Sequence, residues 1–131
     1  MTGIHAPTLD DIERLARAAL RRIPDPLRAH VEGVVMQVVE FPDDETMKDM
    51  ELETPFDILG LYSGIPPGHK DGGAIARQPD MIFLYRRPIL DYWCETGEEL
   101  AHVVRHVFIH EIGHHFGLSD EDMEALEEME D

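Results

Sequence analysis

The chain has 131 residues, with 28 acidic and 11 basic side chains and a formal net charge of −17. A surface this acidic repels phosphate groups, so nucleic acid and membranes are not expected as partners. The length suits a single domain over residues 1–131, which we expect to be a monomer, and the hydrophobic content of 43% fits a packed core.

The cellular location is predicted from features that the sequence lacks. No apolar run approaches the roughly 20 residues needed to span a bilayer. The N-terminus has no basic segment followed by an apolar stretch, so a signal peptide is not expected. The single cysteine, Cys94, cannot form an internal disulfide, and we expect a cytoplasmic protein in which Cys94 is a small core residue.

The first part of the chain predicts a helix followed by strands. Residues 8–22 carry apolar side chains at helical spacing, with Thr8 as the cap and Asp11 in the first turn. A polar connection with room for a helical turn separates the first two strands. The strands are predicted where β-branched and apolar residues cluster, at residues 33–41, 58–62 and 81–90.

The last part of the chain predicts two helices. Thr96 and Glu99 fit a capping box, and Gly117 is placed to end the helix that follows in a left-handed conformation. A short helix starts at about Ser119, and residues 121–131 form an acidic tail that solubilises the chain or, as the alternative, docks a partner. These elements predict an α+β fold in which a small mixed sheet packs on an N-terminal helix and a later helix.

The stretch HEIGHHFGLSD, at residues 110–120, concentrates groups that bind metals. His110 and His114 are four residues apart, so on a helix their imidazoles lie one turn from each other and can hold one zinc ion. Glu111, on the flank of the same face, can take a proton from a metal-bound water without being a ligand. Another first-row metal is the alternative to zinc, because geometry and availability decide which ion is bound.

A catalytic zinc site needs a third protein ligand and one open position. A glutamate on a later helix barely fits, because only 17 residues follow His114. A bend at Gly117, which can take a positive φ, instead brings Asp120 back to the ion as a carboxylate ligand. The alternative for the whole cluster is a solvated polar helix face in a histidine-rich stretch.

The pattern HExxHxxGxxD resembles the extended zinc motif of the metzincin-like peptidases, in the variant with aspartate in place of the third histidine. Over residues 8–126, and including DILGLYSG at 57–64, the chain also looks like the small bacterial zincin-like proteins described as possible minimal zinc metallopeptidases. The resemblance implies a minimal zincin-like fold, with a substrate cleft beside an edge strand. It implies three zinc ligands and one base, namely His110, His114 and Asp120 as ligands and Glu111 as the base.

The resemblance also makes residues 81–90 the edge strand, to which an extended peptide could add through its backbone. Tyr85 or Tyr62 could steady the oxyanion, with a half-buried structural tyrosine as the alternative. The chain departs from larger metzincins, because little sequence follows Asp120. Met123 follows too closely to be assigned as their methionine turn.

The remaining polar residues are expected to be structural or solvated. His102 and His106 continue the spacing of four but drift around the helix, so we expect them at the surface or behind the ligands. His115 lies off the face of the site. Arg86 and Arg87 are expected to form salt bridges, with a substrate carboxylate as the alternative partner. Surface positions are expected for three lone histidines, His5, His30 and His69.

Together, these observations predict a zinc-dependent metallopeptidase that acts on a peptide or protein substrate, in which Glu111 assists a zinc-bound water. The alternative is a catalytically weak or inactive zinc-binding interaction module, with the acidic tail or the edge strand as its docking surface. Substrate specificity is not predicted, because it depends on the shapes of loops.

Overall fold

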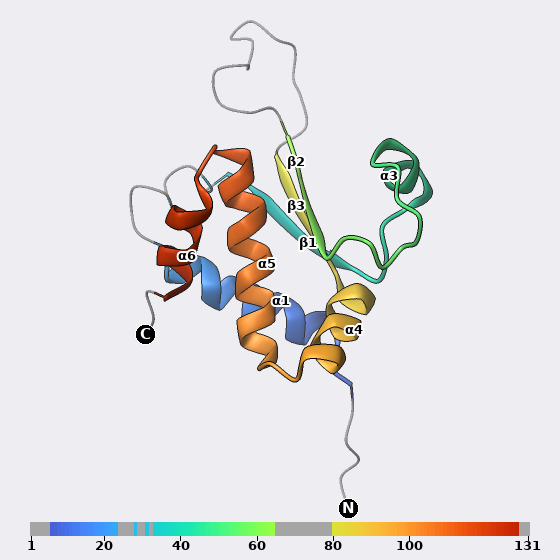
Figure 1. Cartoon of the computed structure of the whole chain (residues 1–131), viewed down its shortest axis with the longest axis horizontal. Coiled ribbons are helices and arrows are strands. Elements are labelled where there is room, and N and C mark those ends of the chain that lie inside the picture. The colour runs from blue at the N-terminus through green and yellow to red at the C-terminus, as the bar shows by residue number, and fades with distance from the viewer. Residues whose placement is uncertain (1–5, 24–27, 29–30, 32, 65–79, 129–131) are drawn as a thin grey trace, which may run out of the picture.

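The computed structural model describes residues 6–23, 28, 31, 33–64 and 80–128, except the side chains of Asp120 and Glu127. Within these residues the chain forms five helices and one three-stranded sheet, which confirms the predicted α+β fold (Figure 1). The helices are α1 (Leu9–Arg21), α3 (Asp44–Asp49), α4 (Arg86–Thr96), α5 (Leu100–His115) and α6 (Asp120–Glu128). The strands are β1 (Val35–Val39), β2 (Gly60–Ser63) and β3 (Met81–Tyr85).

The central strand of the sheet is β3, because the strand order is β1-β3-β2. β1 runs parallel to β3, and β2 runs antiparallel to it with Gly60 opposite Leu84. The prediction that residues 81–90 form the edge strand is therefore wrong. The edges belong to β1 and β2, and β2 is the edge that lies beside α5 (Figure 1).

Residues 86–90, predicted as the end of that strand, instead begin α4. Pro88 falls in the first turn of α4, where a backbone N–H has no partner within the helix, so proline is well tolerated there. Gly97 ends α4 with a φ of 73°, and its N–H donates to the Trp93 carbonyl at 3.0 Å. Cys94 lies exposed on α4, so the prediction of a core position is also wrong.

The start of α5 differs from its prediction as well. The capping box expected at residues 96–99 is wrong, because Thr96 still belongs to α4 and its hydroxyl accepts the Glu98 N–H at 3.3 Å. Glu99 takes the N-cap position, and its side chain makes no cap hydrogen bond with any described residue. The helix itself is confirmed, since its apolar side is buried as the spacing predicts.

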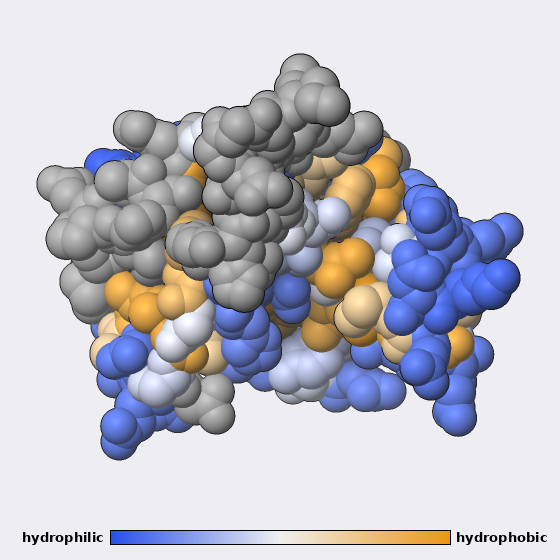
Figure 2. Space-filling view, turned by 90° about the horizontal axis from the view of Figure 1, so that it is seen from above, coloured by the Kyte–Doolittle hydropathy of each residue, from blue (hydrophilic) through white to orange (hydrophobic). Residues whose placement is uncertain are grey.

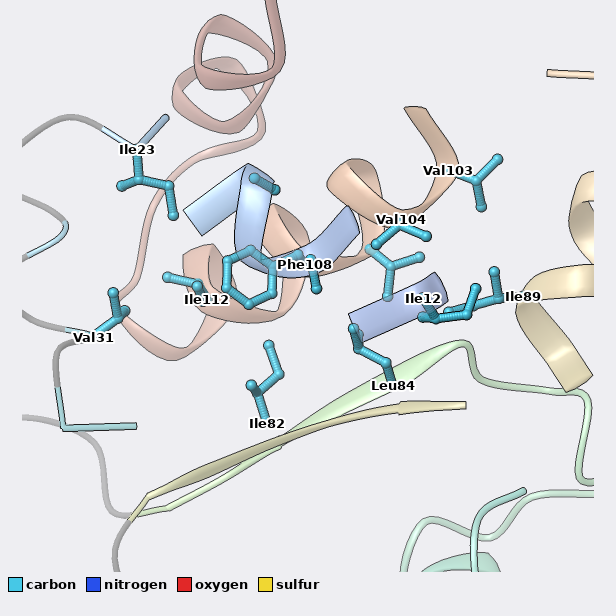
Figure 3. Packing of buried hydrophobic residues seen from close by; sticks show 13 residues of the cluster. Ile12, Ile23, Val31, Ile82, Leu84, Ile89, Val103, Val104, Phe108 and Ile112 are labelled. Carbon is cyan, nitrogen blue, oxygen red and sulfur yellow. The ribbon is translucent and has the colours of Figure 1, made fainter. Parts of the chain in front are cut away.

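The N-terminal helix and its cap are confirmed by α1. The Asp11 N–H donates to the Thr8 hydroxyl at 3.1 Å, and the Thr8 N–H donates to the Asp11 carboxylate at 2.8 Å. Ile12, in the first turn of α1, is fully buried. It belongs to one apolar cluster in which α1 and α5 cover a single face of the sheet and meet Ile82 and Leu84 of β3 (Figure 1, Figure 3).

The end of the molecule that carries α3 is hydrophilic. The Asp43 carboxylate caps α3 by accepting the Thr46 N–H at 2.8 Å, and none of the described residues of α3 is buried. Figure 2 shows hydrophilic side chains gathered at this end, next to a strip of apolar surface. In the described part of the chain, no helix combines the length and the apolar character needed to cross a membrane.

Candidate metal centre

The predicted metal-binding side chains lie on the part of α5 that does not pack into the core. The buried side of the helix holds Val103, Val104, Val107, Phe108, Ile109, Ile112 and Gly113. His110 is half-buried and His114 is exposed. Their ring centroids lie 5.6 Å apart, with the ring planes at 83° to each other. The spacing of four residues thus brings the two imidazoles close together, as helix geometry requires.

Glu111 reaches from α5 to the edge strand β2. Its Oε1 accepts a hydrogen bond from the Tyr62 N–H at 3.2 Å. Burial raises the pKa of the Glu111 carboxyl above its ordinary value, and the Tyr62 N–H and His114 oppose this rise in part. The Tyr62 N–H therefore anchors one oxygen of a partly buried carboxylate.

Tyr62 is a residue of this site that the sequence analysis did not connect to Glu111. Its ring stacks on that of His115, with centroids 3.8 Å apart and planes at 19°. His115, which was expected off the face of the site, is therefore half-buried against β2. No spacing rule could find the contact between Tyr62 and Glu111, because 49 residues separate them. The available signal was the DILGLYSG stretch, which pointed to a family and not to a contact.

The earlier histidines of α5 are exposed, in agreement with the surface positions predicted for His102 and His106. The ring centroid of His106 lies 4.1 Å from that of His110, with the planes tilted by 38°. His106 therefore packs against a predicted ligand and restricts the rotation of its ring. His5, His30 and His69 lie outside the described residues.

The two tyrosines considered as oxyanion donors are held by structural contacts. Burial, followed by the charges of Asp43 and Glu111, raises the pKa of Tyr85 to about 12, and this side chain is only 2% exposed. Burial and then Asp80 raise the pKa of Tyr62 to about 12, and the Tyr62 hydroxyl lies 3.5 Å from Asp80 Oδ2. Both phenols are neutral, and these contacts favour the structural alternative.

The chain turns back directly after α5. Gly117 has a φ of 76°, and its N–H donates to the His114 carbonyl at 3.3 Å. The Leu118 N–H donates to the Gly113 carbonyl at 2.8 Å. These two bonds form a Schellman motif and confirm the predicted left-handed glycine. The backbone of Asp120 begins α6, and its side chain lies outside the described part of the chain.

The predicted C-terminal helix is confirmed by α6, which packs against α5 through Met123. Ser119 caps α6, because its hydroxyl accepts the Asp122 N–H at 3.1 Å. Met123 is fully buried, and a Cβ added at Gly113 would overlap its Sδ. The glycine at position 113 thus lets α6 lie close against the turn of α5 that carries the two imidazoles.

The donors that the structure brings together fit zinc. His110 and His114 offer two imidazole nitrogens on adjacent turns, which is the donor type that zinc prefers. Among the described side chains, which do not include that of Asp120, no group of three or more histidines, cysteines or acids is placed to hold an ion. Of the three predicted ligands, the structure describes the side chains of two, His110 and His114, next to each other.

Arg86 and Arg87 contact their own fold. Arg86 Nη1 lies 2.9 Å from Glu40 Oε1, and Arg86 Nε donates to the Pro7 carbonyl at 2.6 Å. The salt bridge predicted for Arg86 is therefore confirmed. The guanidinium of Arg87 lies over the ring of Phe41, 5.6 Å from its centroid, in a cation–π contact.

Comparison with known proteins agrees with this arrangement. The sequence profile of the zincin-like metallopeptidase family matches residues 31–129, which span every element from β1 to α6. The chain therefore belongs to the zincin-like metallopeptidase family, and its helices and mixed sheet are consistent with a minimal zincin-like fold. No curated protein matches the sequence.

Proposed function

We propose that the chain is a zinc-dependent metallopeptidase that hydrolyses peptide bonds in peptide or protein substrates. One observation carries the proposal. The imidazoles of His110 and His114 are neighbours on α5, and the same helix carries Glu111, a partly buried carboxylate with one oxygen hydrogen-bonded to the edge strand β2. The family to which the chain belongs supports the same chemistry. The proposal takes the enzyme to act as a cytoplasmic monomer, as the sequence leads us to expect.

His110, His114 and Asp120 would hold the metal. The support for Asp120 is the bend at Gly117, which ends α5 and starts α6 within a few residues. Zinc held by these ligands supplies Lewis-acid chemistry, since it polarises a substrate carbonyl and lowers the pKa of water toward about 7. Imidazoles bind metal only when neutral, so protons compete with zinc for these ligands.

Glu111 would carry out the proton transfers. It accepts a proton from the attacking water and later gives it to the amine that leaves the cleaved peptide bond. Because the Tyr62 N–H holds Oε1, the proton is taken at the other oxygen of the carboxylate, Oε2.

A substrate would lie along β2, the edge of the sheet beside α5. In an antiparallel pair, alternate residues of a strand form hydrogen bonds with the neighbouring strand. Leu59 is one of the bonded residues, because its carbonyl accepts the Tyr85 N–H at 3.0 Å. The backbone groups of Gly60 and Tyr62 therefore point away from β3. An extended peptide could add to this edge through the outward groups of Gly60. The edge strand expected at residues 81–90 is thus replaced in the proposal by β2.

A digest of a peptide library, with and without a chelator, tests the proposal. We expect cleavage by the zinc-loaded chain, loss of cleavage with the chelator, and recovery when zinc is returned. Asp120→Ala should weaken zinc binding. Absence of cleavage by a chain that holds stoichiometric zinc would favour the zinc-binding interaction module instead.

A further inference from the structure

We infer that β2 positions the catalytic glutamate: Gly60 sets how closely the strand approaches α5, and the Tyr62 amide holds the Glu111 carboxylate. This inference rests on the proposed function, because it takes Glu111 as the base. It adds two positioning residues on β2, the strand along which the proposed substrate would lie.

The Tyr62 amide is available to Glu111 because of the register of the sheet. Among the strands that the structure describes, β2 pairs only with β3. In an antiparallel pair, alternate residues bond to the neighbouring strand, and Leu59 is one of those, since its carbonyl accepts the Tyr85 N–H. Residues 60 and 62 occupy the alternate positions, whose backbone N–H and carbonyl groups do not bond to β3. The Tyr62 N–H therefore points away from β3 and donates to Glu111 Oε1 at 3.2 Å.

Gly60 permits this contact by letting the strand approach the helix. A Cβ at position 60 would lie 2.8 Å from Val107 Cγ1 and 3.0 Å from the Phe83 carbonyl oxygen. Backbone and a β-branched side chain give way with difficulty, so any larger residue would push β2 from α5. The hydrogen bond from Tyr62 to Glu111 would lengthen as a result.

The approach of Gly60 to Val107 and the contact of Tyr62 with Glu111 are separated by nearly the same distance along β2 and along α5. Gly60 and Tyr62 are two residues apart on β2, a rise of about 6.7 Å at 3.3 to 3.4 Å per residue. Val107 and Glu111 are four residues apart on α5, a rise of about 6 Å. The contact at Gly60 therefore controls the separation at Tyr62.

The Tyr62 ring adds a second attachment to the same helix. It stacks on His115, one turn beyond Glu111 and at the last residue of α5, with ring centroids 3.8 Å apart. The backbone and the side chain of Tyr62 thus contact successive turns of α5. This double attachment prevents the strand from sliding along the helix.

Holding one carboxylate oxygen should affect the rate more than binding. A glutamate side chain has several rotamers, and fixing it before the reaction removes an entropic cost from the transition state. Substrate affinity need not change, because the contact is between protein groups. A loss of this contact should appear in kcat, with KM and zinc content little altered.

The variant Tyr62→Pro tests the amide, with Tyr62→Ala as its matched control. Proline lacks the N–H and is tolerated on an edge strand where that N–H faces away from the neighbour. Both variants lose the ring, and only the proline variant loses the donor. We expect kcat of Tyr62→Pro to fall roughly 10- to 100-fold below that of Tyr62→Ala. Equal kcat values for the two folded variants would overturn the role of the amide.

The variant Gly60→Ala tests the close approach, with Gly33→Ala as the control. A Cβ at Gly33 meets no atom of the described residues within 4 Å, so this variant should keep the parent kcat. We expect Gly60→Ala to lower kcat while zinc binding persists. A parent-like kcat for Gly60→Ala would overturn the role of Gly60.

Hydrogen exchange of the Tyr62 amide separates this inference from the proposed function, because it needs no activity. An outward amide of an edge strand exchanges quickly unless a partner protects it. We expect slow exchange in the parent chain and faster exchange in Glu111→Ala. The control is Glu13→Ala, which removes an exposed carboxylate that pairs with Arg17 on α1 and should keep the exchange slow. If the chain cleaves no peptide, this pattern still supports the contact while the proposed function fails. Fast exchange of this amide in the parent would overturn the inference whether or not the chain is a peptidase.

Discussion

The helices α1 and α5 cover the same face of the sheet but use their polar sides differently. In α1, polar side chains stabilise the helix itself. Thr8 and Asp11 cap its start, and Arg17 pairs with Glu13 one turn earlier, at 2.8 Å. All these contacts lie within the helix or its cap, and all are exposed.

In α5 the polar side chains contact one another and the edge strand. His110 lies between His106 and His114, and Glu111 accepts a hydrogen bond from Tyr62. The N-cap position of α5 contributes no side-chain bond to a described residue. The helix is stabilised by its buried side, and its polar side carries the candidate metal centre.

The comparison predicts two kinds of variant. Changes on α1 should alter the free energy of unfolding and leave catalysis alone. Changes on the polar side of α5 should alter catalysis and leave the free energy of unfolding nearly unchanged. The following predictions test this division.

The largest effect is expected from Glu111→Gln. Loss of the base should lower kcat roughly 10²- to 10⁴-fold, while zinc content and the free energy of unfolding stay close to those of the parent. The matched control is Glu13→Gln on α1, which removes a charge from an exposed ion pair. Parent-like cleavage by Glu111→Gln would contradict the role of this residue.

Ile12→Ala should have the largest effect on stability. Ile12 is fully buried between α1 and the sheet, so its truncation should cost about 2–5 kcal/mol of unfolding free energy. Denaturant unfolding measures the loss. The kcat of the folded fraction should be unchanged, and a large fall in kcat would show that α1 takes part in the site.

Alkaline pH should destabilise the fold through Tyr85, by less than the truncation of Ile12. Its pKa is about 12 in the folded chain and 10.0 as the ordinary value, so the unfolded chain ionises first. The stabilising contribution is therefore complete below about pH 10 and is lost as the pH rises through about 12. Tyr85→Phe should reduce this loss in denaturant midpoints. An identical dependence on pH in the variant would refute the prediction.

A smaller effect is expected from Thr8→Ala, which removes the cap of α1. The Asp11 N–H loses its acceptor, and the free energy of unfolding should fall by about 1 kcal/mol. The rate of cleavage should not change, since the described hydrogen bonds of the cap join only Thr8 and Asp11. A destabilisation above that of Ile12→Ala would contradict this ranking.

Most features encoded by local spacing could be predicted from the sequence, and the capping box expected at residues 96–99 is the exception. The periodicity of α1, its Thr8 cap and the left-handed Gly117 all depend on residues within a few positions of one another. The i, i+4 pair of His110 and His114 is local in the same sense. Their arrangement follows from helix geometry without knowledge of the rest of the fold.

Features that depend on distant contacts could not be predicted. Pro88 was interpreted as the end of a strand, but it fits equally well in the first turn of α4. The central place of β3 depends on pairing with strands far along the chain. The contact between Tyr62 and Glu111 joins residues 49 positions apart, and neither residue carries a local signal for it.

Elemental analysis of the purified chain tests the central claim, that the polar side of α5 is a zinc site. We predict about one zinc ion per chain in the parent and in Glu111→Gln, and loss of that zinc when His110 and His114 are both changed to alanine. A folded parent that holds no zinc after zinc is supplied, or a double variant that keeps the parent stoichiometry, would contradict the account.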